Sequence, residues 1–370
     1  MINVIEELKK LKAWWRTEIN TEIIVSANAI NDLFYKIEEK EKDTFFIIDS
    51  ALKEDDKYNK IFAQKDKYLF DATLSEPKTG DVNKLVSLIK SLGRDINLVV
   101  GIGGGSTIDL TKATSICLAN PKKAEEYQGY DMEMAKGPEI WAVPTLFGTG
   151  AEITPIAVLR GPERKLGINN KHTSPDVAMI DPQLPITTPK FNRFYTMMDC
   201  YYHHYEITKS KTSKSEAILD AEDGLALARE LLSSGVEPFN IEASIKAAKA
   251  SILGGSSTIG GRVGGAHAIS YGLSNSSPTL PHSVAVTISM LALENLYPDG
   301  YRDTVHFLEA NEMPRPNAAD YGINESHIEK MVKTSMGMTK LWESCFGEEY
   351  RKYATEEFMR KIYEKIVSEK

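Results

Sequence analysis

The chain has 370 residues, 42% of them hydrophobic, and this length is expected to form two domains of about 100–200 residues each. Its formal net charge of −8 argues against binding to nucleic acid or to an anionic membrane, because both favour a basic surface. No apolar run approaches the about 20 residues of a membrane-spanning helix, and residues 1–15 lack the apolar core and cleavage site of a signal peptide. The three cysteines, at positions 117, 200 and 345, are too far apart for a disulfide framework or a thiolate zinc site. A cytoplasmic setting is therefore expected.

Up to about residue 182, short apolar runs alternate with amphipathic segments. Strands are predicted at residues 23–27 and in runs that end at Asp49, Asp71, Gly103 and Pro144. A helix is predicted over residues 80–92, and the runs at 153–160 and 176–182 are expected to return to the same sheet or its edge. The alternation of strands and helices predicts a parallel sheet covered by helices.

After Pro185 the sequence carries long segments with helical spacing and few strand signals. We therefore expect an α/β nucleotide-binding domain over residues 1–182 and an all-helical metal-binding domain over residues 183–370. A ligand site is expected between the two domains, which is a common place for one.

A glycine-rich turn follows the predicted strand that ends at Gly103. Glycines at 103, 104 and 105 would let backbone N–H groups approach a ligand, and Ser106 and Thr107 are expected to cap the next helix, whose N-terminus favours an anion such as a diphosphate. A tight strand-to-helix turn without a ligand is the alternative. Lys112, further along, is expected to be a solvated helix residue.

A second loop, from Pro144 to Glu152, also follows a predicted strand and offers the hydroxyls of Thr145 and Thr149. Two such loops at the carboxyl ends of neighbouring strands could hold one dinucleotide. Asp49 ends an earlier strand, where a carboxylate could accept the ribose hydroxyls and would repel a 2′-phosphate, which favours NAD over NADP. The alternative for Asp49 is a residue that starts a turn.

The segment TMMDCYYHHYE, residues 196–206, places polar groups among methionines and tyrosines. Asp199 and His203 are four residues apart and would share one face of a helix, whereas His204 would point about 100° away. With His267 and His282 downstream, one carboxylate and three imidazoles could bind Fe²⁺ or Zn²⁺. Ordinary buried or surface histidines remain the alternative.

Several motifs together resemble the iron-containing alcohol dehydrogenase family, within the larger group that includes dehydroquinate synthase. They are GIGGGSTIDLTKA, PTLFGTGAEIT, VAMIDPQL, MDCYYH and the histidines at 267 and 282, in family order. The resemblance implies a nucleotide-binding α/β domain, a helical metal domain, a usual homodimer, and metal ligands at Asp199, His203, His267 and His282. It also implies cofactor contacts, which map to Gly103, Gly104, Gly105, Ser106, Asp109, Thr145, Thr149 and Lys165.

More narrowly, residues 165–182, FYTMMDCYYHHYE and SYGLS resemble the branch that includes 3-deoxy-manno-octulosonate 8-oxidase. That likeness suggests a sugar or sugar-acid substrate, whose terminal CH₂OH is oxidised to an aldehyde with a nicotinamide cofactor. Arg262, in a glycine-rich run, could clamp a substrate carboxylate, or could equally form an ordinary ion pair.

One position departs from the resemblance. Where many family members carry a second histidine, four residues after the third ligand, this sequence has Tyr271. The alcohol proton would then leave through Tyr271 or His204. Two other readings stay open: a lyase or cyclase of the dehydroquinate synthase kind, and a metal-stabilised scaffold without turnover.

Overall fold

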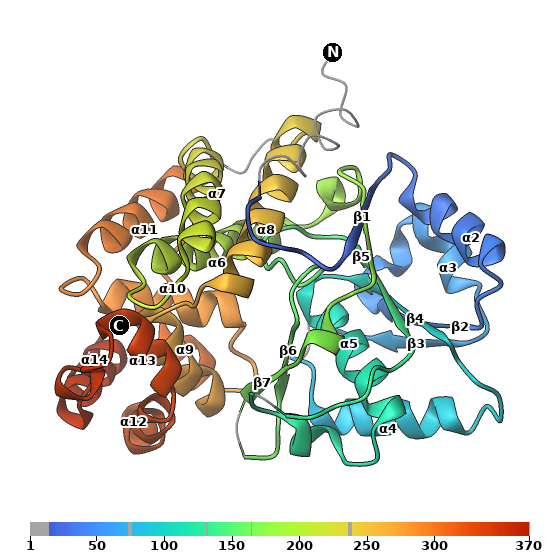
Figure 1. The fold of residues 1–370 in the computed structure, drawn as a ribbon. Helices are drawn as coiled ribbons and strands as arrows, with labels where there is room; N and C mark the ends of the chain where they lie inside the picture. The colour runs from blue at the N-terminus through green and yellow to red at the C-terminus, as the bar shows by residue number, and fades with distance from the viewer. Residues whose placement is uncertain (1–14, 73–75, 131, 164, 236–238, 370) are drawn as a thin grey trace. The chain divides into compact units, whose positions relative to one another are not determined.

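The computed structural model describes residues 15–72, 76–130, 132–163, 165–235 and 239–369, so the prediction about a signal peptide at the start of the chain largely lies outside the described residues. The chain divides into two compact units (Figure 1). The α/β unit comprises residues 19–146 and 150–187, and the helical unit comprises residues 15–18, 147–149 and 188–369. None of the helices in the described ranges combines the length and apolar character needed to cross a membrane.

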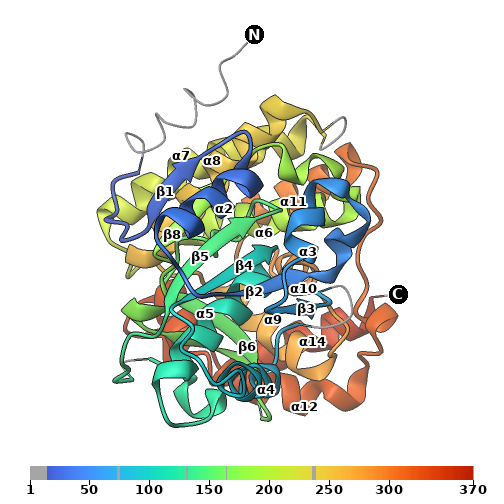
Figure 2. The ribbon, with the colours of Figure 1, turned by 90° about the vertical axis from the view of Figure 1, so that its right-hand side faces the viewer.

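The α/β unit is built on a six-stranded sheet in which every pair of neighbouring strands is parallel (Figure 2). In spatial order the strands are β1 (Glu22–Val25), β8 (Val177–Ile180), β5 (Glu139–Pro144), β4 (Leu98–Gly103), β2 (Thr44–Asp49) and β3 (Lys67–Phe70). The strands predicted in this half of the chain are confirmed. Register places Gly103 opposite Pro144, so the two predicted loops begin at neighbouring points of one sheet edge.

Helices cover both faces of this sheet because successive side chains of a strand point to opposite faces. Phe45 and Ile47 of β2 pack on one side, and Phe46 and Ile48 pack on the other. The first side is covered by α4 (Thr79–Lys90) and α5 (Gly105–Ala119), and the second by α2 (Ala29–Glu39) and α3 (Asn59–Phe62). The α/β class and the helix predicted over residues 80–92 are therefore confirmed.

One strand lies in a different sheet from the one predicted. The run at 153–160 does not return to the main sheet: β6 (Ile156–Arg160) pairs antiparallel with β7 (Lys165–Asn169) as a separate two-stranded sheet. β6 pairs along its whole length with the next strand in the chain, from Ile156 opposite Asn169 to Arg160 opposite Lys165, so its backbone groups find local partners outside the main sheet. The following run, at 176–182, does return to the main sheet as β8.

The helical unit contains nine named α-helices among the described residues. They are α6 (Lys190–Lys209), α7 (Ser215–Ser233), α8 (Ile241–Gly260), α9 (Gly265–Ser276), α10 (His282–Ala292), α11 (Pro298–Ala310), α12 (Ile328–Met336), α13 (Thr339–Phe346) and α14 (Glu356–Ser368). Helix α6 packs against α7, α8 and α10, and α9 packs against α10 and α12 (Figure 1). The predicted helical second half is confirmed.

Candidate metal centre and nucleotide-binding turn

The turn between β4 and α5 requires glycine at position 103. Gly103 has a φ of 157°, and a Cβ there would lie 2.6 Å from Oγ1 of Thr107 and 2.9 Å from Cβ of Asp49. Side chains therefore leave no room for one more atom, and the ends of β4 and β2 meet closely. The structure thus brings together Asp49 and the first glycine of the predicted phosphate-binding turn.

Helix α5 starts earlier than the predicted capping arrangement requires. Its N-cap is Gly104, and no side chain among the described residues caps it; Ser106 and Thr107 lie inside the first turn, so the prediction that they cap the helix is wrong. Oγ1 of Thr107 is buried. An uncapped helix N-terminus beside glycines presents backbone N–H groups and a partial positive charge, the arrangement that suits a phosphate.

Asp49 starts a turn, as in the alternative to ribose binding that was considered for it. Its carboxylate accepts a hydrogen bond of 3.0 Å from the backbone N–H of Ala51, and burial raises the pKa of Asp49 above its ordinary value. The carboxylate still lies at the sheet edge beside Gly103. Its contact with a ribose stays a prediction.

Asp109, which is partly exposed, and Lys112, which is buried, form an ion pair on α5. Nζ of Lys112 lies 3.3 Å from Asp109 and donates to Oγ1 of Thr154 and the carbonyl of Ile156, while the other Asp109 oxygen accepts from the N–H of Val158. Burial raises the pKa of Asp109 and lowers the pKa of Lys112. Lys112 is fully buried, so the prediction of a solvated lysine is wrong. The aliphatic stem fits the core because the ammonium group is fully hydrogen-bonded.

Of the remaining predicted cofactor residues, Lys165 and Thr145 belong to the α/β unit and Thr149 to the helical unit. Lys165 is buried on β7 and its Nζ lies 2.5 Å from Glu76, which also pairs with Arg160. Thr145 donates its backbone N–H to the carbonyl of Gly103.

Gly148, in the same loop, packs against the helix that carries Asp199. A Cβ at Gly148 would come within 2.5 Å of the carbonyl oxygen of Thr196 on α6. The close approach of two backbones therefore accounts for this glycine.

Three of the four predicted metal ligands converge in the helical unit. Asp199 on α6, His267 on α9 and His282 at the start of α10 each offer an atom within 4.8 Å of the others. Oδ1 of Asp199 lies 3.5 Å from Nε2 of His267 and 3.9 Å from Nε2 of His282. Asp199 and His267 are almost fully buried, and His282 is partly exposed.

This geometry fits a divalent cation better than it fits hydrogen bonds. Ligands about 2.1 Å from a tetrahedral ion lie roughly 3.4 Å from each other, close to the 3.5 Å that separates Asp199 from His267. Oδ1 of Asp199 and Nε2 of His267 are buried, and neither has a hydrogen-bond partner within the described ranges. Buried polar atoms left in this way are costly, and a shared cation would satisfy both.

The electrostatics of the cluster point the same way. Burial alone would raise the pKa of Asp199, but His203, His267 and His282 outweigh it and hold that pKa well below its ordinary value. Burial alone would lower the pKa of His267, but Asp199 and Glu206 outweigh it and raise that pKa to about 9. The carboxylates thus make a centre that attracts positive charge.

Comparison with known proteins finds similarity to alcohol dehydrogenases. Residues 20–182 match the family model for iron-containing alcohol dehydrogenase. An NAD-dependent methanol dehydrogenase of Bacillus methanolicus is 28% identical over 258 residues, 66% of each chain. Alcohol dehydrogenase 4 of Schizosaccharomyces pombe is 24% identical over 326 residues, 80% of this chain and 76% of the relative.

The part of the chain from residue 20 to residue 182 is thus similar to the iron-containing alcohol dehydrogenase family. This similarity supports the expected enzyme class, an oxidoreductase of this alcohol dehydrogenase type. A solved sulfoacetaldehyde reductase of Bifidobacterium kashiwanohense, in complex with NAD⁺, has the same fold, with a TM-score of 0.78 over 96% of this chain and 99% of that one, at 21% identity. The sequence match to the methanol dehydrogenase spans slightly less than two thirds of that relative's length.

The fourth ligand that the family implies, His203, lies beside the converged group without being part of it. Its ring stacks on that of His267, with centroids 4.7 Å apart and planes 12° apart. Nδ1 of His203 is buried with no hydrogen-bond partner in the described chain, and burial lowers the pKa of His203. Its role as a ligand stays a prediction.

The two residues proposed to take the place of the family's second histidine differ sharply. Tyr271 lies one turn after His267 on α9, and its ring centroid is 6.3 Å from that of His282. His204 is fully buried, and its Nε2 is 3.0 Å from the carbonyl of Ala250. His204 therefore faces the packing of α6 against α8, and Tyr271 is the better placed of the two to move a proton.

Glu206 was not singled out from the sequence. It lies seven residues after Asp199 on the same face of α6, is almost fully buried, and its Oε2 is 2.5 Å from Nδ1 of His267. The signal that could have found it is the spacing D-x-x-x-H-x-x-E on one predicted helix.

Arg262, the predicted clamp for a substrate carboxylate, lies between the end of α8 and the start of α9. The backbone of Arg262 is fixed on both sides, since its N–H donates to Oγ of Ser213 and its carbonyl accepts from Oγ of Ser344.

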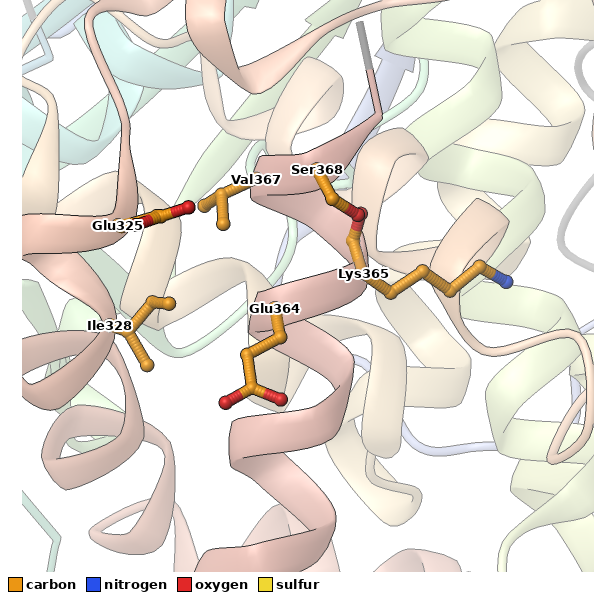
Figure 3. A pocket seen from close by; sticks show the side chains of 6 residues that line it. All are labelled: Glu325, Ile328, Glu364, Lys365, Val367 and Ser368. Atoms are coloured by element: carbon orange, nitrogen blue, oxygen red, sulfur yellow. The ribbon is translucent and has the colours of Figure 1, made fainter.

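A hollow near the C-terminus contains none of the predicted site residues (Figure 3). It is lined by Glu325, Ile328, Glu364, Lys365, Val367 and Ser368.

Proposed function

We propose that the protein is a metal- and NAD-dependent oxidoreductase that interconverts a primary alcohol and an aldehyde. The observation that carries the proposal is the convergence of Asp199, His267 and His282, in which Oδ1 of Asp199 and Nε2 of His267 are buried without a hydrogen-bond partner in the described ranges. Similarity to iron-containing alcohol dehydrogenases supports the chemistry, and a glycine turn at the edge of a parallel sheet supports a dinucleotide.

In this proposal Asp199, His203, His267 and His282 hold Fe²⁺ or Zn²⁺. When bound, such an ion acts as a Lewis acid that lowers the pKa of an alcohol hydroxyl. The chain's own residues do the rest: buried aromatic side chains of α6 keep water from Asp199, and Oη of Tyr271 accepts the alcohol proton as its own hydroxyl hydrogen passes to solvent. On reduction of an aldehyde, the same hydroxyl returns the proton.

The α/β unit binds the dinucleotide in this proposal. The turn at Gly103, Gly104 and Gly105 and the N-terminus of α5, with Ser106, receive the diphosphate, and Asp49 accepts the ribose hydroxyls. The nicotinamide, when bound, carries the hydride. Asp109 and Lys165, each held in an internal ion pair, act by fixing the elements that form the site. The carboxylate of Asp49 favours NAD over NADP.

The narrower proposal is a sugar-acid substrate, with oxidation of the terminal CH₂OH of 3-deoxy-manno-octulosonate as the specific case. It rests on the sequence segments of that branch and on Arg262 as a clamp for the carboxylate. The comparisons leave the charge of the substrate open, because the similar proteins include, by name, both a methanol dehydrogenase and a sulfoacetaldehyde reductase. A homodimer and a cytoplasmic location also stay predictions.

The test is anaerobic purification with Fe²⁺, followed by absorbance at 340 nm with NAD⁺ and a panel of alcohols. The panel runs from methanol and 1,3-propanediol to 3-deoxy-manno-octulosonate, with oxygen uptake followed in parallel. NADH formed with any member supports the oxidoreductase, and NADH formed only with the sugar acid supports the narrower substrate. Absence of NADH across the panel, with metal bound, would contradict the proposal as stated and favour the lyase or the scaffold.

A further inference from the structure

Helix α6 carries one buried carboxylate that lies outside the proposed ligand set, Glu206. Glu206 follows Asp199 by seven residues and His203 by three, so all three share one face of the helix. Its side chain is fully buried. A buried carboxylate is costly unless its oxygens are hydrogen-bonded, so its partners indicate its role.

The partners of Glu206 all belong to the first turn of α9. One oxygen, Oε1, accepts from the backbone N–H of Ala266 at 2.6 Å. The other, Oε2, lies 3.4 Å from the backbone N of His267 and 2.5 Å from Nδ1 of its ring. The same carboxylate therefore contacts both the backbone and the imidazole of a proposed metal ligand.

The contact with the ring selects a tautomer. An ionised carboxylate can only accept, so Nδ1 of His267 must donate its hydrogen to Glu206. In the neutral ring this leaves the lone pair on Nε2, the atom 3.5 Å from Oδ1 of Asp199. A ligand histidine held in this way is oriented and made more basic toward a metal.

The contacts with the backbone serve a different purpose. Helix α9 has Gly264 at its N-cap, and the cap residue itself gives no side-chain hydrogen bond. The N–H of Gly265 donates to Oη of Tyr297 at 3.0 Å, and the next amide donates to Glu206. Tyr297 and Glu206 thus share the capping of one helix end, but of these two only Glu206 touches the His267 ring.

We propose that Glu206 is a positioning residue that holds His267 in the Nδ1–H tautomer and thereby sets the metal affinity of the centre. The inference rests on the metal site proposed above. The competing role is helix capping alone, which Tyr297 also performs. The two roles are separable because Tyr297 supports the same turn of α9 through a different bond.

The test compares Glu206→Gln with Tyr297→Phe, using Zn²⁺ as the probe in competition with a chelator. The carboxamide keeps the shape of Glu206 and loses the negative charge, so Zn²⁺ affinity is expected to fall by about 10–100-fold, as for other residues that orient a ligand histidine. Tyr297→Phe removes one capping bond and is expected to lower Tm while leaving Zn²⁺ affinity within about twofold of the wild type.

Each outcome bears on the inference. Unchanged affinity in Glu206→Gln, or losses of affinity that match in the two variants, would overturn it, because Glu206 would then be only a cap. Failure of the wild type to bind Zn²⁺ would overturn the proposed metal site as well.

A second measurement needs no variant and covers the case in which Glu206→Gln does not fold. Histidine-selective ¹⁵N NMR of the zinc-loaded wild type should show a proton on Nδ1 of His267 and a metal-bound Nε2. A proton on Nε2 would overturn the inference. Glu206→Asp, which keeps the charge on a shorter side chain, is expected to recover part of the lost affinity.

Discussion

The candidate sites of the two units differ in which part of the chain forms them. In the α/β unit the site is made mainly of backbone: a glycine with a φ of 157°, an uncapped helix and the edge of a parallel sheet. In the helical unit the site is made of side chains from α6, α9 and α10 that converge on one point. A backbone site depends on room for the chain, whereas a side-chain site depends on charge and orientation. Substitutions in the helical unit's site should therefore act mainly on metal binding and turnover, and substitutions in the α/β unit's site mainly on stability and on binding of the dinucleotide.

The largest expected effect lies in the side-chain site. Asp199→Asn removes the negative charge that three histidines face, so bound metal should be lost and turnover should fall by more than the about 10–100-fold typical of a residue that only orients a ligand. Metal content and the rate of NADH formation would check this. Asp220→Asn is the matched control, because Asp220 is equally buried but bonds Ser256 and the backbone of Arg16 and Thr17. It should lower Tm and leave the metal in place.

The next effect tests the ion pair of Asp109 and Lys112 in the α/β unit. Lys112→Met leaves the largely buried Asp109 without its cation and should reduce the free energy of unfolding by about 3–5 kcal/mol. Replacing both residues with apolar ones, as Lys112→Met with Asp109→Leu, should recover most of that loss. Denaturant unfolding would measure both. A single variant as stable as the wild type would show that the pair contributes nothing.

Glycine packing gives a smaller effect in the helical unit. A Cβ at Gly224 would lie 2.0 Å from Cε1 of His204, whereas one at Gly254 would lie 3.5 Å from Nε2 of the same ring. Gly224→Ala should cost stability near the upper end of the about 1–3 kcal/mol typical of overpacking. Gly254→Ala should cost less. Equal Tm values for the two variants would contradict this placement of His204.

The smallest expected effect on stability comes from alanine substitutions in the glycine turn between β4 and α5. Gly103→Ala would place a Cβ 2.8 Å from Cβ of Thr107 and 2.9 Å from Cβ of Asp49, which side-chain rotation cannot move, and should cost stability within the about 1–3 kcal/mol typical of overpacking. Gly104→Ala meets nothing within 4 Å and should keep Tm unchanged. If the dinucleotide lies on this turn, Gly104→Ala should nevertheless raise KM for NAD⁺. Lower Tm in Gly104→Ala would contradict the open space at this position.

The sequence was sufficient for features that depend on local pattern. Alternating apolar runs located the strands of the main sheet, and the D-x-x-x-H spacing placed Asp199 and His203 on one helix. His267 and His282 were candidates by residue type alone, and the resemblance selected them as predicted metal ligands, because no local rule joins residues 68 or more positions from Asp199.

Features that depend on tertiary contacts were missed. Lys112 has the sequence context of an exposed helix residue, and only Thr154 and Ile156, more than 40 residues away, make its burial favourable. The pairing of β6 depends on β7, a strand that lies outside the run at 153–160. Glu206 has significance only because it meets the ring of His267, 61 residues later.

The most direct test of the central claim is a titration of metal-free protein with Fe²⁺ under anaerobic conditions, with NADH formation followed at 340 nm. Turnover is expected to rise in step with bound metal, to saturate near one ion per chain and to be absent in Asp199→Asn. Full turnover without metal, or in Asp199→Asn, would contradict the account, because Asp199, His267 and His282 would then not form the centre on which the chemistry depends.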